Sequence, residues 1–421
     1  MTTTDFPSLG VGTPLCRALS DLGYQHPTPI QTQAIPKLLA GKDLIGIAQT
    51  GTGKTAAFAL PILQTLIANR EHAQPQRPKV LVLSPTRELA AQIRDEIASL
   101  AQHTSLRHAC IYGGVGQNPQ INALKSGVEI LVATPGRLLD LASNSFVDLG
   151  AISHLVLDEA DRLMDMGFIR DVRKIIRLLP RERQSLLFSA TMPTEVAKLA
   201  AEILQNPTRV QVSPKRVTAE KIEQGVLMVD NDRKQEALQA LLKAPGVTRA
   251  IVFTRTKHGA NRVAKKLTKH GICADALHGN KSQNARTRAL ENFKSGDAWV
   301  LVATDIAARG IDIEEVSHVI NFELPHEPES YVHRIGRTAR AGATGIAWSL
   351  VDPSELKRLK AIERLTKVQA KILDLEIPNL VDTTAGPTAK STKIGKRPEG
   401  GSRQQRNRRR RRRPQRRRSA A

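Results

Sequence analysis

The sequence has little of three things, and each shortage narrows what the protein can be. Three cysteines occur in 421 residues, Cys16, Cys110 and Cys273, and their wide spacing supports neither a disulfide framework nor a metal cluster. Aromatic residues make up only 3% of the chain, so flat surfaces for stacking are scarce. No apolar run approaches the roughly 18 residues of a membrane span, and the first residues lack the basic and apolar regions of a signal peptide. A cytoplasmic protein without membrane contact is therefore expected.

Positive charge, in contrast, is abundant and concentrated near the end of the chain. The formal net charge is +23, and from Thr383 onward fifteen Lys or Arg residues stand against one acid, Glu399, a local charge of +14. This segment is rich in Gly, Gln, Ser and Pro and has no apolar periodicity, so residues 381–421 are predicted to be a disordered tail. We interpret it as a sequence-independent tether for a polyanion, bound through phosphate and sugar. A solubility tail or a localisation signal is the alternative.

Residues 48–55 match the P-loop that binds nucleotide phosphates. Its two glycines let backbone N–H groups point at phosphate oxygens, while Lys54 reaches the β- and γ-phosphates and the Thr55 hydroxyl binds Mg²⁺. A buried strand is predicted before the loop, over 43–47, and a helix after it, which is the context a P-loop requires. The alternative is a glycine-rich turn that opens a helix. The candidate nucleotide ligands are Thr50, Gly51, Thr52, Gly53, Lys54 and Thr55.

An acidic motif follows about a hundred residues later. The apolar run 155–157 is followed by Asp158, Glu159, Ala160 and Asp161 at the end of a predicted strand. Taken alone, this tetrad could be a solvated turn. Paired with a P-loop at the end of a hydrophobic strand, it indicates a protein that consumes a nucleoside triphosphate.

Two series of apolar segments, each alternating with helical patterns, predict two α/β domains with parallel sheets. The strands are expected over 43–47, 79–83, 129–133, 154–158 and 185–188, and again over 250–254, 272–276, 300–303, 318–321 and 345–351. The predicted boundaries are an N-terminal domain at 1–208, a flexible linker at 209–220, a second domain at 221–380 and the tail. Polar motifs stand just past many of these strands, the edge where open α/β sheets bind ligands.

In that order the motifs resemble those of the DEAD-box RNA helicases, and the resemblance covers roughly residues 6–350. The matching segments are 23–24, 27–31, 48–55, 85–90, 113–114, 134–137, 158–161, 189–191, 252–256, 303–312 and 333–340. Within the family, segments 256–261 and 277–283 look most like the bacterial RhlE-type proteins. The resemblance implies two tandem RecA-like domains. The first would bind ATP and Mg²⁺, and the second would complete the nucleotide site.

The resemblance also implies roles at the nucleotide. Gln31 would read the adenine edge, and Phe6 would pack on the ring. Asp158 would hold Mg²⁺, and Glu159 would orient and deprotonate the attacking water, since phosphoryl transfer depends mainly on positioning. Asp312 would meet the ribose.

In the second domain, Arg337 and Arg340 would be arginine fingers that reach the γ-phosphate when the domains close. His333 and Arg334 would connect these fingers to the acidic motif. Ala339 stands where the family usually has glycine, which affects local geometry only if the backbone there has a positive φ.

Asp161 would couple hydrolysis to domain closure through Ser189 and Thr191. RNA would lie across both domains with weak sequence preference, because hydroxyls, glycine backbones and guanidinium groups bind phosphate and 2′-OH groups. The expected RNA contacts are Arg87, Gly114, Thr134, Arg137, Thr256, Gln283, Arg286 and Thr304.

The sequence thus predicts a monomeric ATP-dependent RNA helicase, an RNA-stimulated ATPase that opens short duplexes or remodels RNA–protein complexes. Ribosome assembly and RNA decay, with their precursors and complexes as partners, are what the resemblance implies. Two alternatives stay open at this point. One is a DNA-directed translocase with the same two-domain plan, and the other is RNA annealing driven by the Arg-rich tail.

Overall fold

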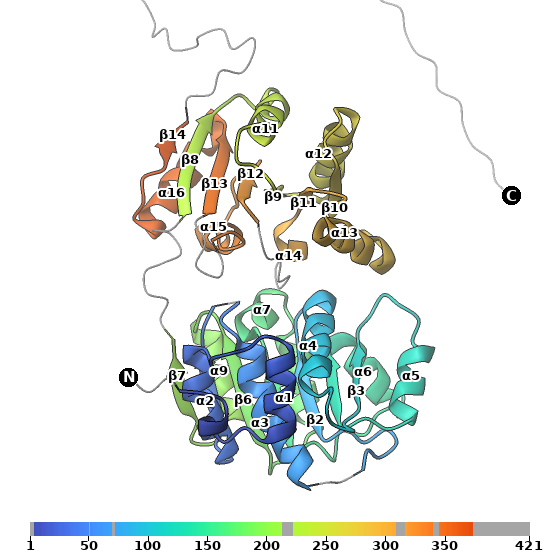
Figure 1. Cartoon of the computed structure of the whole chain (residues 1–421). Helices are drawn as coiled ribbons and strands as arrows, with labels where there is room; N and C mark the ends of the chain where they lie inside the picture. The colour runs from blue at the N-terminus through green and yellow to red at the C-terminus, as the bar shows by residue number, and fades with distance from the viewer. Residues whose placement is uncertain are drawn as a thin grey trace, which may run out of the picture. The chain divides into compact units, whose positions relative to one another are not determined.

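Two seven-stranded parallel sheets organise the protein (Figure 1). The computed structural model describes residues 4–49, 51–69, 72–212, 222–308, 316–339 and 345–373. Every ladder within the two sheets is parallel. The predicted pair of α/β domains is confirmed. Among the described helices none is both long and apolar enough to cross a membrane.

The first sheet has the strand order β3-β4-β2-β5-β6-β1-β7. Its strands are β1 (Leu44–Ile47), β2 (Val80–Leu83), β3 (His108–Ile111), β4 (Ile130–Ala133), β5 (His154–Leu157), β6 (Gln184–Ser189) and β7 (Thr208–Gln211). The helices of this half are η1 (Pro7–Leu9), α1 (Thr13–Asp21), α2 (Pro29–Leu39), α3 (Lys54–Asn69), α4 (Arg87–Leu100), α5 (Asn118–Lys125), α6 (Pro135–Ser143), α7 (Ala160–Asp165), α8 (Ile169–Ile176) and α9 (Thr194–Ile203).

The second sheet repeats this plan in the order β10-β11-β9-β12-β13-β8-β14. Its strands are β8 (Ile222–Met228), β9 (Ala250–Phe253), β10 (Ala274–Leu277), β11 (Val300–Ala303), β12 (His318–Asn321), β13 (Gly345–Val351) and β14 (Lys371–Ile372). Its helices are α11 (Lys234–Leu242), α12 (Lys257–Lys269), α13 (Gln283–Ser295), α14 (Asp305–Ala308), α15 (Pro328–Ile335), η2 (Pro353–Glu355) and α16 (Leu356–Thr366).

Side chains alternate along the central strands of the first sheet, so that each face has its own core. Val80 and Val82 belong to a cluster shared with α1 to α4, whereas Leu81 and Leu83 belong to a cluster shared with α5, α6, α8 and α9. Figure 1 shows α1, α3 and α4 on one side of this sheet. A parallel sheet covered on both faces explains why its strands read as continuous apolar runs rather than alternating ones.

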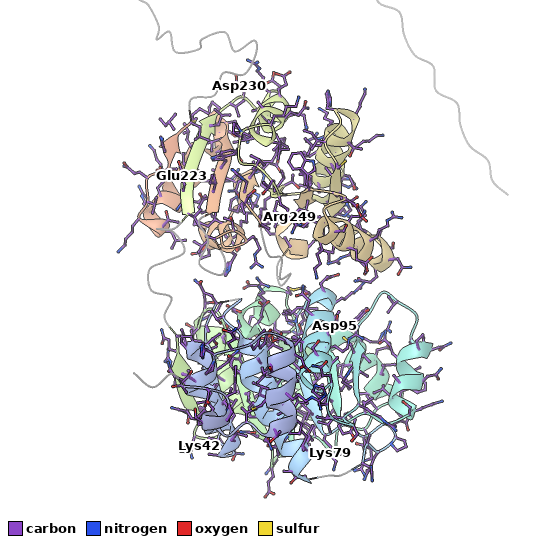
Figure 2. The ribbon with its side chains drawn as sticks, in the orientation of Figure 1. Lys42, Lys79, Asp95, Glu223, Asp230 and Arg249 are labelled. Carbon is purple, nitrogen blue, oxygen red and sulfur yellow. The ribbon has the colours of Figure 1, made fainter. Side chains whose placement is uncertain are left out.

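A Ser-His pair at equivalent places shows how closely the two halves correspond. Ser153 Oγ donates to the Lys79 carbonyl (3.2 Å) and lies 2.9 Å from Nδ1 of the next residue, His154. Ser317 Oγ donates to the Arg249 carbonyl (2.9 Å) and lies 2.9 Å from Nδ1 of His318. Lys79 and Arg249, labelled in Figure 2, directly precede β2 and β9, the matching central strands.

The motif-bearing loops of the first half share one edge of its sheet. Lys42 and Lys79 (Figure 2) stand just before β1 and β2 and mark the amino ends of the strands. The P-loop, Ser84, Thr134 and Asp158 follow β1, β2, β4 and β5 at the opposite edge. Because all strands are parallel, these loops converge, as expected for a ligand site.

The structure adds to the sequence expectations at the ends of the sheets. β7 pairs with β1, so the first sheet continues through Gln211 and past the boundary predicted at residue 208. Predicted site residues Thr50, Asp312 and Arg340 lie outside the described residues. Most of the expected linker and the whole tail do so as well.

Candidate functional site

The P-loop connects β1 to α3 and contains two glycines with a left-handed backbone. Gly51 and Gly53 have φ values of 80° and 86°, in the region that favours glycine. Lys54 opens α3 and is almost fully buried, and its Nζ donates to the Ala48 carbonyl at 3.0 Å. The N-terminus of α3 therefore faces the loop, which places backbone N–H groups and one ammonium group where an anion would bind.

Gln31 ties the segment before it to the P-loop. Its Oε1 accepts from the backbone N–H of Thr28 (2.8 Å) as part of the capping box of α2, and its Nε2 donates to the Gly53 carbonyl (3.1 Å). Phe6 lies in the apolar cluster on this side of the sheet and is 4% exposed. The expected contacts of Gln31 and Phe6 with an adenine ring stay predictions.

Asp158 stands at the end of β5 with an oxygen available for a ligand. The residue is 3% exposed, and its Oδ1 has no hydrogen-bond partner among the described residues. Burial raises the pKa of Asp158 to about 6, with Lys54 opposing and Glu159 reinforcing that rise. A buried carboxylate oxygen without a proton donor fits a hard cation.

Glu159 is held in an unusual way. Its φ of 50° is left-handed, and it stands at the N-cap of α7. The guanidinium of Arg162, one turn later, donates to its Oε2, and both side chains are more than nine-tenths buried. Sequence analysis did not select Arg162, although the i, i+3 spacing on a helix would have allowed the pair. The ion pair fixes the carboxylate expected to act on water.

Asp161 joins the acidic motif to the loop after β6. Its Oδ2 accepts hydrogen bonds from the backbone N–H and the hydroxyl of Thr191, each at 2.9 Å. Its own N–H donates to Ser189 Oγ at 3.2 Å. The three residues predicted to act together are therefore in direct contact.

Arg334 is buried in the second half and bonded to several groups there. It donates from Nε and Nη2 to the two carboxylate oxygens of Asp305, at 2.5 and 2.7 Å, and from Nη1 to Asn321 and the Glu323 carbonyl. Its guanidinium lies over the Phe253 ring at 5.1 Å. These bonds all stay within the second half, so the expected link from Arg334 to the acidic motif is not made here, and its coupling role stays a prediction.

The residues beside Arg334 carry the candidate fingers. Arg337 is 5% exposed and donates from Nε to the His333 carbonyl at 3.3 Å. Ala339 has a φ of +55°, a left-handed conformation for a residue with a Cβ. Alanine here therefore adopts a backbone conformation that glycine adopts more readily.

Three of the four RNA-contact candidates of the first half line a cavity of about 440 Å³, to which Arg286 also contributes. We call it the first-half cavity because its other lining residues belong to that half. Arg87, Thr134 and Arg137 line it, and Arg137 Nη2 donates to the Val115 carbonyl at 3.2 Å. Gly114 has a φ of 78°, and a Cβ there would collide with the Arg87 guanidinium. The positive φ therefore favours glycine at 114, and a larger residue would also displace the Arg87 guanidinium.

Glu88 engages two candidates of the second half, and sequence analysis did not select it. Its carboxylate accepts from Gln283 Nε2 at 3.0 Å and from Arg286 Nη2 at 2.8 Å. Arg87 donates to Gln283 Oε1 at 3.3 Å. Thr256, another candidate, caps α12 by accepting from the Gly259 N–H at 2.9 Å.

Comparison with known proteins decides the family. A family model described as DEAD/DEAH box helicase matches residues 28–199, and one described as helicase conserved C-terminal domain matches 233–342. The chain is 44% identical over 383 residues to the DEAD-box ATP-dependent RNA helicase CshA of Bacillus cereus, which covers 91% of this chain and 72% of that relative. The chain belongs to the DEAD-box ATP-dependent RNA helicases.

Two further relatives of this DEAD-box protein extend the comparison. RhpA of Helicobacter pylori is 42% identical over 391 residues, 93% of this chain and 78% of the relative. The structure of S. cerevisiae Dbp5 bound to RNA and ADP BeF3 superposes with a TM-score of 0.77 at 32% identity, covering 88% of this chain and 95% of that one. The predictions of the family and of two RecA-like domains are confirmed.

Proposed function

We propose that this chain is an ATP-dependent RNA helicase, an enzyme in which RNA stimulates ATP hydrolysis and hydrolysis drives local opening of short duplexes or remodelling of RNA–protein complexes. One structural observation supports this proposal in addition to family membership. Asp161 binds Ser189 and Thr191 beside the P-loop lysine and the available oxygen of Asp158. A nucleotide site and a loop that can respond to it are thereby joined by hydrogen bonds.

ATP would be held mainly by the first half. Lys54 and the N–H groups that open α3 would bind its phosphates, with Gln31 and Phe6 at the base. Asp158 and Thr55 fit Mg²⁺, which when bound would neutralise phosphate charge and orient the γ-phosphoryl group. Among the described residues no group of three or more His, Cys, Asp or Glu side chains is placed to hold a metal ion.

Glu159 would take the proton of the attacking water, oriented by its bond with Arg162. Arg337, with Arg340, would complete the site from the second half, and Asp312 would contact the ribose. Fingers of this kind contribute about 10³–10⁵ in rate in other P-loop enzymes. Hydrolysis without RNA is therefore expected to be slow.

RNA would bind as the partner along the residues around the first-half cavity and along Thr256, Gln283, Arg286 and Thr304. The protein would work as a monomer, with ribosomal precursors or RNA-decay complexes as targets. All three cysteines carry free thiols, as is usual in the reducing cytoplasm. Segments 256–261 and 277–283 support placement near the RhlE-type proteins.

Steady-state ATP hydrolysis tests the proposal. The full chain is assayed with no nucleic acid, with single-stranded RNA and with DNA of the same sequence. We expect RNA, but not DNA, to stimulate ATP hydrolysis, since the named relatives are RNA helicases. Equal stimulation by DNA would favour a translocase on DNA, and annealing without any hydrolysis would favour a chaperone that acts through the Arg-rich tail.

A further inference from the structure

Ser84 has a buried hydroxyl that nothing in the proposed catalytic scheme uses. The residue follows β2 directly and is 0% exposed. Its Oγ is buried and has no hydrogen-bond partner among the described residues. Buried hydroxyls nearly always have a partner, so one without calls for a water or a ligand beside it.

The strand register places Ser84 next to the metal-binding candidate. Leu83 is in register with Leu157 of β5, and the N–H of Asp158 donates to the Leu83 carbonyl at 3.0 Å, so Ser84 and Asp158 are the next pair along the ladder. Their predecessors on the same face, Val82 and Val156, share one core cluster. By the alternation of side chains, Ser84 and Asp158 point to that face, on strands roughly 4.8 Å apart.

On the strand at its other side, Ser84 has a candidate RNA-contact residue, Thr134, as its neighbour. Leu83 is also in register with Ala133 of β4, and the Ser84 N–H donates to the Ala133 carbonyl at 2.9 Å, which makes Thr134 the partner of Ser84 on that side. Thr134 lines the first-half cavity. The serine therefore stands between a candidate RNA contact and the carboxylate that fits Mg²⁺.

The second half offers an internal comparison. Thr254 follows β9, the counterpart of β2, and its N–H donates to the Ala303 carbonyl as that of Ser84 does to Ala133. Thr254 Oγ1 donates to the Thr256 carbonyl at 3.3 Å. The Thr254 hydroxyl, which has a local partner, lies in the half of the chain without the acidic motif. The hydroxyl without one is beside Asp158, whose Oδ1 lacks a donor as well.

We propose that Ser84 is a positioning residue for Asp158: its hydroxyl donates, through one bridging water, to the available carboxylate oxygen and holds that carboxylate in the orientation that binds Mg²⁺ with the nucleotide. This inference rests on the proposed ATP-binding function. A carboxylate can only accept hydrogen bonds, and a serine can donate one. A water is needed because the two side chains make no direct bond, and a water between buried polar groups typically makes two to four bonds.

The test is the Mg²⁺ dependence of nucleotide binding by the full chain, measured with a fluorescent ADP analogue so that no turnover is required. Ser84→Ala should raise the Mg²⁺ concentration at half-maximal binding by about 10-fold, the lower range for loss of a group that orients a metal ligand. Binding in EDTA should not change. Ser84→Thr keeps a hydroxyl and should therefore keep the wild-type Mg²⁺ midpoint. Ser84→Val introduces a side chain with the shape of threonine but no hydroxyl, and its midpoint should rise as in Ser84→Ala.

Ser185→Ala is the matched control, because Ser185 is also a buried serine of this sheet, in β6. It shows how far the Mg²⁺ midpoint changes when any buried hydroxyl of the sheet is removed. Equal Mg²⁺ midpoints for wild type and Ser84→Ala would overturn the role of Ser84 alone. If Ser84→Ala does not fold, equal midpoints for the Thr and Val variants would overturn it. A wild-type chain that binds nucleotide without any response to Mg²⁺ would overturn the metal assignment and this inference together.

Discussion

Asp161 accepts both the backbone N–H and the hydroxyl hydrogen bond of Thr191, each at 2.9 Å, on a single carboxylate oxygen. The two residues are thirty positions apart; Asp161 lies in α7, just after β5, and Thr191 lies in the loop after the adjacent strand β6. Bonds to a charged acceptor are the stronger kind of hydrogen bond in proteins. We therefore predict that a shift of the acidic motif on nucleotide binding would be transmitted to the loop that follows Ser189.

Thr191→Val tests this link, because it removes the hydroxyl bond and leaves the backbone bond in place. We expect nucleotide affinity to stay within about 2-fold of wild type, while the amount of duplex opened per ATP hydrolysed falls several-fold. The measurement is a strand-displacement assay run in parallel with phosphate release. Thr194→Val, at the exposed start of α9, is the control. Unchanged coupling in Thr191→Val would remove this contact from the coupling path.

The buried Glu159–Arg162 pair predicts a non-additive result. Arg162→Met should lower the free energy of unfolding by about 3–5 kcal/mol, because it leaves a buried carboxylate without its cation. Glu159→Gln with Arg162→Met removes both charges and should recover at least about 1 kcal/mol relative to the sum of the single changes. Urea unfolding of the four proteins measures this coupling. Additive losses would contradict it.

Turnover separates the roles of the same two residues. Glu159→Gln should keep nucleotide binding but lower RNA-stimulated hydrolysis by about 10²–10⁴, as for loss of a general base. The double variant should be as inactive, although its stability is partly restored. Recovery of hydrolysis together with stability would show that Glu159 is needed for folding and not for the chemistry.

Ala339 offers a stabilising substitution. Its φ of +55° costs a residue with a Cβ about 1–2 kcal/mol, whereas glycine adopts the conformation freely but loses about 0.5–1 kcal/mol through unfolded-state entropy. Ala339→Gly should therefore raise the free energy of unfolding by up to about 1 kcal/mol, and the β-branched Ala339→Val should lower it. Urea midpoints give the comparison. A glycine variant less stable than wild type would mean that the segment relaxes to negative φ.

All the central strands except β8 could be predicted from the sequence, whereas three of the four edge strands could not. β2, β4 and β5 are buried along their whole length and appear as short apolar runs. The edge strands β3, β7 and β14 are partly exposed and short, so their sequences carry little apolar signal. β8 contains Glu223, Gln224 and Gly225 and follows the segment assigned to the linker, which hid it.

The site shows the same division. Motif spacing selected Lys54, Asp158 and Asp161 as candidates, because the proposed chemistry requires a residue type at a fixed place on a strand-loop-helix unit. It did not identify Arg162 or Glu88, because these residues are defined by partners that only tertiary packing brings close. It also gave no sign that Arg334 would be engaged by Asp305.

The buried histidines of the Ser-His pairs predict how stability depends on pH. The ordinary pKa of a histidine side chain is 6.5. Burial lowers the pKa of His154 to about 4 and also lowers the pKa of His318. Between pH 6.5 and 4 the unfolded chain therefore binds protons that the folded chain excludes. The contribution of His154 is fully present above pH 6.5 and is lost as the pH falls to about 4, a loss of roughly 3 kcal/mol.

His154→Gln isolates this contribution, since the amide is neutral throughout. Burial raises the pKa of Asp158 to about 6, which acts in the opposite sense between about pH 4 and 6 but is common to both proteins. The free energy of unfolding of wild type should therefore fall more steeply than that of the variant as the pH drops from 6.5 to 4, and His318→Gln should flatten the curve in the same direction. Denaturant unfolding at half-unit pH steps measures the difference. Parallel curves for wild type and His154→Gln would mean that the folded chain admits the proton, which would place water beside Ser153 rather than a closed apolar core.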